Sequence, residues 1–131
     1  MWPFRSASSS GLGPRGERLA LRYLKRGGLK VLARNYRCGA GEIDLIMLDP
    51  STCARGGAET IAFVEVKTRA SDHYTAPAAA VDGEKRRRIT KAAQHYLAGR
   101  DASAFSIRFD IVSIVVPPGG KPIIEHIPQA F

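Results

Sequence analysis

Four charged residues stand out in two segments that are otherwise rich in Ile, Leu, Val and Phe. Glu42 and Asp44 form one pair and Glu65 and Lys67 the other, and one residue separates the members of each pair. On a β-strand, that spacing places both members on the same face. Acidic groups that hold a divalent cation, with a lysine beside them, are the groups that the hydrolysis of a phosphodiester uses.

The two segments, 42–48 and 61–68, predict a β-hairpin whose loop turns about the Ala54–Arg55 bond. In that register Asp44 lies opposite Glu65. Directly opposed residues are about 5 Å apart, so the two carboxylates repel unless a cation neutralises them or one keeps a proton. The register also places Glu42 opposite Lys67, Ile46 opposite Phe63 and Leu48 opposite Ile61, with Ile43, Leu45, Val64 and Val66 on the other face.

A bound cation is the economical answer to this repulsion. Mg²⁺ takes oxygen ligands at about 2.1 Å and keeps waters that substrate phosphates can replace. Lys67 would then orient or deprotonate the attacking water and offset charge developing on phosphorus. The alternative is structural: Glu42 and Lys67 form a cross-strand ion pair, and Asp44 and Glu65 lie at a solvent-facing end of the sheet.

Glu17 is a further acid, from the start of the first predicted helix, on the side that should face the sheet. There it could complete a metal shell. Acids in a first helical turn are also favoured by the helix dipole without any further role, and on the residues alone this second interpretation is the stronger one.

The rest of the chain predicts the elements that position these residues. Apolar residues at helical spacing predict one helix over 16–26 and another that begins after Asp82 and ends near 98, where Gly99 follows. Further strands are expected over 29–35, 105–116 and 123–127. The order predicts an α/β fold, a single domain over 15–131 with a mixed β-sheet flanked by helices, after a flexible N-terminal tail over 1–14.

Charge is spread unevenly along the 131 residues, whose formal net charge is +8. Residues 1–40 hold nine basic residues and one acidic residue, residues 41–84 hold three and eight, and residues 85–131 hold eight and three. Basic flanks around an acidic middle indicate a polyanion partner and a cation at the centre, although basic helix faces are also often simply solvated. No apolar run approaches the length of a membrane helix, so we expect no membrane partner and a cytoplasmic protein.

Basic residues on the two helices are the candidates for nucleic-acid binding. They would hold phosphates without reading bases, which gives sequence-independent affinity for duplex or branched DNA that falls steeply with salt. The candidates are Arg18, Arg22, Lys85, Arg87, Arg88 and Lys91 on the helices, together with Arg69 just past the second strand of the hairpin. The competing function is a binding protein that uses these faces without cutting, and a homodimer stays open because cutting two strands usually needs two sites.

Several motifs together resemble a known family. The run 41–46, Gly-Glu-Ile-Asp-Leu-Ile, followed by 63–69, Phe-Val-Glu-Val-Lys-Thr-Arg, resembles the signature of PD-(D/E)xK nucleases, and more narrowly the YraN family of small bacterial proteins. The resemblance extends from Gly16-Glu17 through Asn35-Tyr36-Arg37 to the C-terminal 126–131. Ile43 stands where the motif has its proline, a residue that contributes no chemistry.

The resemblance implies a restriction-endonuclease-like fold and kinship with Holliday-junction resolvases. By that analogy Asp44 and Glu65 would hold Mg²⁺ or Mn²⁺, Lys67 would be the catalytic lysine and Glu17 would match an acid on the first helix. The predicted metal ligands are thus Asp44, Glu65, Glu17 and Glu42, and the predicted catalytic residues are Lys67, Glu65 and Asp44. Kinship of fold does not by itself transfer a substrate.

Overall fold

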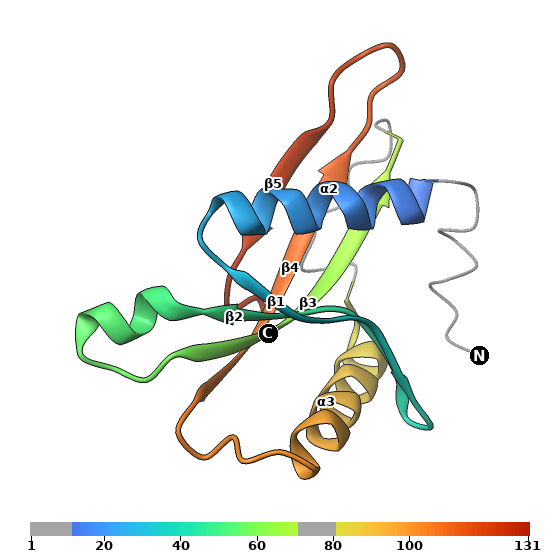
Figure 1. Ribbon diagram of the computed structural model, residues 1–131. Helices are drawn as coiled ribbons and strands as arrows, with labels where there is room; N and C mark the ends of the chain where they lie inside the picture. Colours follow the sequence, from blue (N-terminus) through green and yellow to red (C-terminus); the bar gives the residue numbers. More distant parts are fainter. Residues whose placement is uncertain (1–11, 71–80) are drawn as a thin grey trace.

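The computed structural model describes residues 12–70 and 81–131, which form one five-stranded sheet with helices packed on it (Figure 1). The sheet order is β1-β2-β3-β4-β5; β3 and β4 are parallel and the other neighbours antiparallel. The elements are α2 Leu12–Arg26, β1 Lys30–Cys38, β2 Gly41–Asp49, the 3-10 helix η1 Pro50–Arg55, β3 Thr60–Arg69, α3 Gly83–Ala98, β4 Ser106–Val115 and β5 Ile123–Ile127. The predicted α/β fold with a mixed sheet is confirmed.

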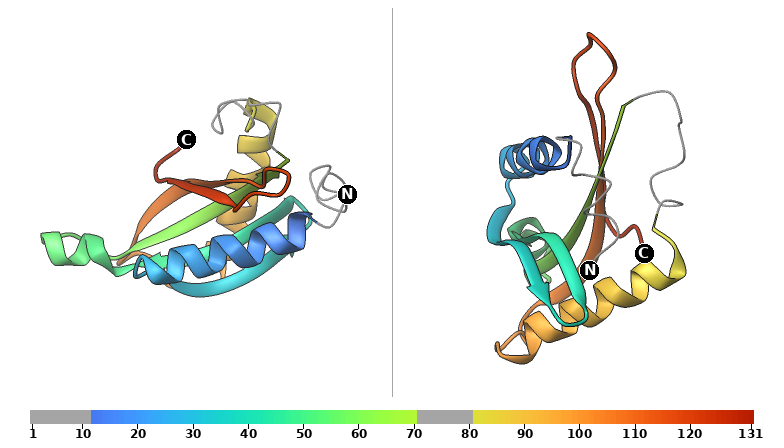
Figure 2. Two further views of the ribbon diagram at one scale, coloured as in Figure 1. Left: turned by 90° about the horizontal axis from the view of Figure 1, so that it is seen from above. Right: turned by 90° about the vertical axis from the view of Figure 1, so that its right-hand side faces the viewer.

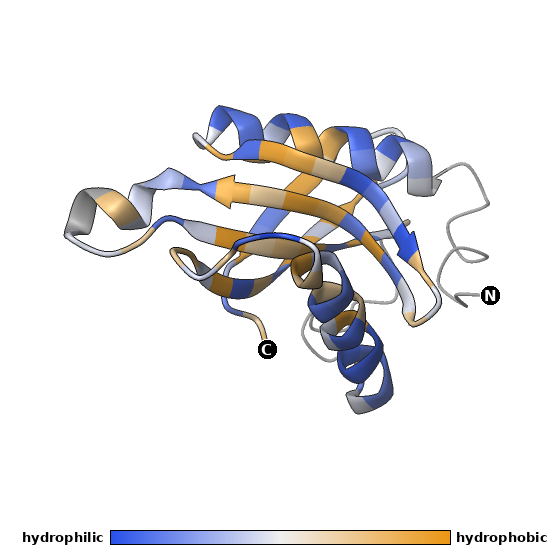
Figure 3. Cartoon of the chain, turned by 60° about the horizontal axis from the view of Figure 1, so that its bottom comes forward, coloured by the Kyte–Doolittle hydropathy of each residue, from blue (hydrophilic) through white to orange (hydrophobic). Residues whose placement is uncertain are grey.

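The two helices pack against different faces of the sheet, as the side view in Figure 2 shows. Ala20 and Leu24 of α2 join the core on one face with Leu45 and Val64. Parallel strands need a crossover, and α3 lies in the connection between β3 and β4. Figure 3 shows hydrophilic residues gathered along the outer sides of both helices, over strands that are largely hydrophobic. None of the described helices is long and apolar enough to cross a membrane.

The first described helix begins earlier than the sequence predicts. α2 starts at Leu12, so residues 12–14 belong to the helix and not to the predicted tail, and residues 1–11 lie outside the described part of the chain. Pro14 does not prevent this, because a proline in a first helical turn removes an N–H group that has no intrahelical partner there. The start predicted from the sequence, residue 16, is therefore too late.

The predicted hairpin register is confirmed over the part of β2 and β3 that forms a ladder. Leu45 pairs with Val64, Ile46 with Phe63 and Leu48 with Ile61. The pairing continues to Asp49 and Thr60 beside η1. In the other direction the ladder ends at the Leu45–Val64 pair, so the two strands part at Asp44 and Glu65.

One predicted orientation is wrong. Ile43 was expected to share a face with Leu45, but it packs with Ile46 in the core beneath α3. The register of β1 and β2 places Asn35 between the pairs that flank Asp44, and Asn35 has a left-handed backbone with φ of 51°. Asparagine tolerates this conformation better than most residues. We attribute the changed alternation to this distortion, since Tyr36, just after Asn35, also joins the α3 core.

Candidate functional site

Asp44 lies where the backbone pairing of β2 and β3 ends, and there its side chain forms the hydrogen bond to β3. Its Oδ2 accepts a hydrogen bond of 2.8 Å from the backbone N–H of Val66. The residue is buried, with 8% of its surface exposed. A carboxylate that accepts a backbone N–H bond is held in place, so the acid group of Asp44 is fixed beside Glu65, the residue before Val66 in β3.

Glu65 joins this strand end to helix α3 through an ion pair. Its Oε2 contacts the Nζ of Lys85, and the two side chains are 4% and 1% exposed. The carboxyl groups of Glu65 and Asp44 are also close enough to share a hydrogen bond. The predicted proximity of Asp44 and Glu65 is therefore present in the structure, with a lysine from α3 added to it.

The start of α3 determines where Lys85 lies. Asp82 is the N-cap, as predicted, and its carboxylate accepts a 2.9 Å hydrogen bond from the backbone N–H of Lys85. Such a cap satisfies an N–H group that the first turn leaves without a helical partner. Lys85 lies one turn before the buried Ile89, so its stem follows the apolar side of the helix towards the sheet and its ammonium meets Glu65.

Burial changes the acid–base properties of both charged residues of β3. Burial raises the pKa of the Glu65 carboxyl, against the opposing effects of Lys85, Lys67 and the hydrogen bond with Asp44. Burial also lowers the pKa of the half-buried Lys67 ammonium, and the nearby charges of Lys85 and Arg69 lower it further. A lysine with a lowered pKa gives up its proton more readily than one in water, as a group that assists proton transfer must.

The four predicted metal ligands are not gathered into one shell. Among the residues that the structure describes, no group of three or more His, Cys, Asp and Glu side chains is placed to hold a metal ion. Glu42 instead forms a 2.9 Å ion pair with Arg37, its neighbour in β1. Glu42 is thus engaged by Arg37 in this structure, and the assignment of Glu42 and Glu17 to one shell with Asp44 and Glu65 stays a prediction.

Glu17 belongs to a helix end that approaches the same strand. A Cβ atom on the preceding residue, Gly16, would lie 2.0 Å from Oγ1 of Thr68, the residue after Lys67 in β3. Only glycine allows the backbone of α2 to come this close. The first turns of α2 thus lie against the end of β3, and Glu17 is half-buried there without forming a metal group with the other acids.

The basic residues of α3 divide into two groups. Lys85 is buried, so it does not lie on an exposed phosphate-binding face, contrary to the expectation from the sequence. Arg88 forms a 2.7 Å ion pair with Glu84 on the surface. Arg87 and Lys91 are exposed on the outer side of the helix. The remaining predicted residues lie elsewhere: Arg69 is half-buried at the end of β3, and Arg18 and Arg22 are exposed on α2.

A second buried charged group was not anticipated from the sequence. The carboxylate of Asp110, fully buried in β4, accepts hydrogen bonds from Arg108 at 2.8 and 2.9 Å. His126 lies 2.8 Å away in β5, and the backbone N–H of Gln129 donates at 3.1 Å. Arg108 also bonds Asp49 at 2.9 Å. These contacts fix the C-terminal segment to the sheet, and two of the partners, His126 and Gln129, belong to the C-terminal run 126–131 noted in the sequence.

The fold and site together define a class of protein. An antiparallel hairpin that carries an acid in its first strand and Glu-x-Lys in its second, next to a parallel strand and between helices, is consistent with a restriction-endonuclease-like fold. Residues 16–114 match the family described as "Uncharacterised protein family UPF0102". The chain belongs to this family, the YraN family that the motifs resemble.

Relatives align with nearly the whole chain. A UPF0102 protein of Geobacter metallireducens is 48% identical over 126 residues, which cover 96% of each chain. One from Nocardia farcinica is 43% identical over 127 residues, or 97% of this chain and 94% of the relative. One from Trichlorobacter lovleyi is 36% identical over 129 residues. Their names give the family and no activity, so function has to be argued from the site.

Proposed function

We propose that this protein is a Mg²⁺- or Mn²⁺-dependent endonuclease that hydrolyses phosphodiester bonds of DNA, on branched or otherwise structured DNA in repair or recombination. The observation that supports this most is the pair of buried carboxyl groups of Asp44 and Glu65, with Lys67 on the same strand as Glu65. Buried charged groups without a chemical role are disfavoured in a protein core, because taking them out of water is costly.

The donor atoms of this pair suit a hard divalent cation. Asp44 and Glu65 present only oxygen atoms, which Mg²⁺ prefers over nitrogen or sulfur ligands. Mg²⁺ is commonly bound through one or two carboxylates together with substrate phosphates, so two acids are enough. The ion would supply Lewis acidity at the scissile phosphate and a water of lowered pKa.

The residues of the chain have separate roles in this proposal. Asp44, fixed by the N–H group of Val66, and Glu65 would hold the ion. Lys67 orients the attacking water and offsets the negative charge that develops on phosphorus. Lys85 holds the Glu65 carboxylate in position from α3 and so acts through Glu65 on the reaction.

One observation favours a second candidate function. The ion pair between Lys85 and Glu65 neutralises that acid without any metal. A domain that only binds nucleic acid through its basic helix faces needs no more than such internal compensation. In that case the acidic pair is structural, and the protein binds DNA without cutting it.

Cleavage assays separate the two functions. Labelled linear, nicked, flapped and four-way-junction DNA would be incubated with the protein and Mg²⁺ or Mn²⁺, using wild type, Lys67→Ala and the control Lys121→Ala, whose lysine is exposed in the β4–β5 connection. We expect cleavage by wild type and the control and none by Lys67→Ala. Binding by wild type without cleavage of any substrate in Mn²⁺ would replace the nuclease with the binding protein.

A further inference from the structure

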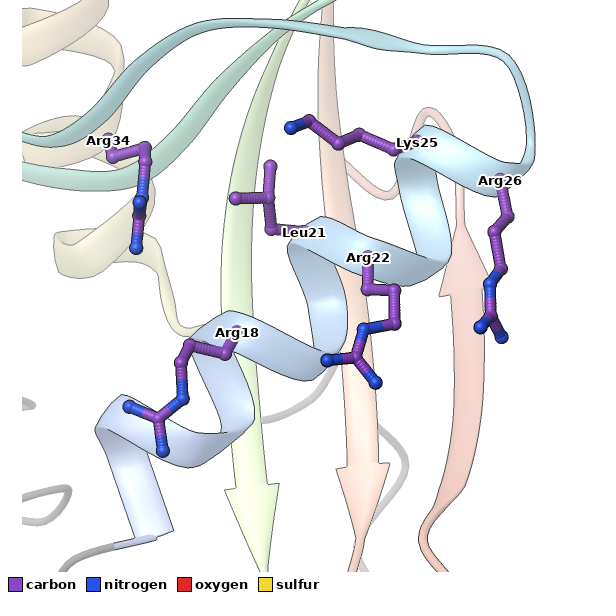
Figure 4. A pocket seen from close by; sticks show the side chains of 6 residues that line it. All are labelled: Arg18, Leu21, Arg22, Lys25, Arg26 and Arg34. Atoms are coloured by element: carbon purple, nitrogen blue, oxygen red, sulfur yellow. The ribbon is translucent and has the colours of Figure 1, made fainter.

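The outer side of α2 and strand β1 form a pocket that is distinct from the Asp44–Glu65 site. It has a volume of about 480 Å³. Figure 4 shows that Arg34 enters it from β1, while the other lining residues come from α2. Five of the six lining residues are basic: Arg18, Arg22, Lys25, Arg26 and Arg34, with Leu21 as the sixth.

The pocket and the Asp44–Glu65 site lie on different sides of the sheet. α2 packs through Ala20 and Leu24 on the face that carries Val64, and it presents its basic residues outward. Glu65 instead meets Lys85, which belongs to α3 on the opposite face. A polymer in the pocket would therefore contact residues other than those around the acidic pair.

The spacing of the basic residues indicates a linear polyanion. Arg18, Arg22 and Arg26 recur every four residues, which places them about 6 Å apart along the helix axis on one side of α2. Lys25 and Arg34 widen this row into a strip. The positive charges in this strip repel one another. A partner with a matching row of negative charges, such as a nucleic-acid backbone, relieves that repulsion and binds favourably.

The charge balance of the helix supports the same partner. The first turn of α2 carries no acid and its last turn carries Lys25 and Arg26. None of the six lining residues is acidic, whereas surface arginines on α3 include one, Arg88, that is paired with an acid of its own helix. Arginine contacts phosphate oxygens through several N–H groups and reads no base in this mode.

We propose that the α2–β1 pocket is a second DNA-binding surface, which holds the phosphate backbone of a duplex segment that is not at the Asp44–Glu65 site. The identity of the polymer rests on the proposed function. The binding itself does not, because it needs neither a metal ion nor cleavage. The protein then contacts its substrate at two separated places, and sequence-independent contacts in the pocket position the segment that is cut on the other face.

Salt-dependent binding tests the pocket independently of catalysis. Affinity for a labelled DNA duplex would be measured by fluorescence anisotropy in EDTA, in a Lys67→Ala background, between about 50 and 200 mM salt. The pocket variant is Arg18→Gln/Arg22→Gln. The matched control, Lys30→Gln/Lys121→Gln, removes the same charge from exposed residues outside the pocket. Arg18→Lys/Arg22→Lys keeps the charge in place.

We expect the pocket variant to bind DNA more weakly and to lower the slope of log affinity against log salt by about 1.8, because each phosphate contact contributes about 0.9. The control and the lysine variant should keep the slope of the parent. An equal loss of slope in the control would overturn the proposal, since net charge alone would explain it. Pocket-dependent binding to phosphatidylglycerol vesicles, with the DNA slope unchanged, would also overturn it. If wild type cleaves no DNA while the pocket variant still shows this slope change, the pocket stands and only the nuclease is rejected.

Discussion

Replacing Lys85 with methionine tests whether the buried ion pair with Glu65 is what holds the site together. Methionine keeps most of the length of the side chain, so the main change is the loss of the ammonium. Glu65 then remains as a buried acid without this partner, with 4% of its side chain exposed. Removing one partner of a buried ion pair costs about 3–5 kcal/mol in free energy of unfolding. The charge of Lys67 remains near Glu65, so the expected loss is at the lower end of this range, about 3 kcal/mol.

A loss of this size is measurable by urea denaturation followed by circular dichroism. For m of about 2 kcal/mol/M, the midpoint should fall by about 1.5 M. The matched control is Lys91→Met, the same exchange at an exposed position of α3, which should change stability by less than about 0.5 kcal/mol. In a double-mutant cycle, Lys85→Met with Glu65→Gln should cost clearly less than the sum of the two single changes. A Lys85→Met midpoint equal to that of the control, or strict additivity in the cycle, would refute the reasoning.

Three further changes test other parts of the structure. Asp44→Asn should abolish cleavage in Mg²⁺ while DNA binding in EDTA stays within about twofold of wild type, because the amide oxygen still accepts the N–H bond but carries no charge; retained cleavage would reject the site. Gly16→Ala should destabilise the fold by about 1–3 kcal/mol, since the new methyl group would lie 2.0 Å from Oγ1 of Thr68, and Thr68→Ala should restore part of the loss in thermal melts. Asp110 has a lowered pKa because its hydrogen bonds outweigh the effect of burial. Its stabilisation is therefore present above the unfolded value of 3.8 and lost as pH falls below it, so Asp110→Asn should flatten the acid limb of the stability–pH curve.

Most of the fold follows from local sequence signals. The apolar periodicity around Leu24 and Ile89 and the cap at Asp82 predict both helices, and the Pro and Gly clusters separate the strands. The hairpin register also follows, because a one-residue slip would exchange Ile46 and Phe63 with the residues of the opposite face. The proximity of Asp44 and Glu65 is a direct consequence of that register.

The parts that could not be predicted depend on contacts between distant elements. The partner of Glu42 is Arg37, which a hairpin register for β2 and β3 cannot reveal because β1 supplies it. Lys85 lies four residues before the buried Ile89, and periodicity alone does not say whether a lysine at such a position faces water or a buried acid. Asn35 carries the distortion in β1, but asparagine has many other uses in a chain, so its left-handed backbone is a poor signal on its own.

The charges at the site lead to a final prediction about metal binding. Asp44 and Glu65 are balanced by Lys67 and Lys85, so a divalent cation added alone would leave an uncompensated positive charge in a buried place. The phosphate of the substrate supplies the missing negative charge, and we therefore expect ion and DNA to bind together. Mg²⁺ alone should leave the melting temperature of wild type nearly unchanged and should raise that of Lys85→Met, where one positive charge is missing and the ion stabilises the folded state by mass action. Equal stabilisation of both proteins by Mg²⁺, with Lys91→Met as the control, would show that Lys85 does not oppose the ion at this site.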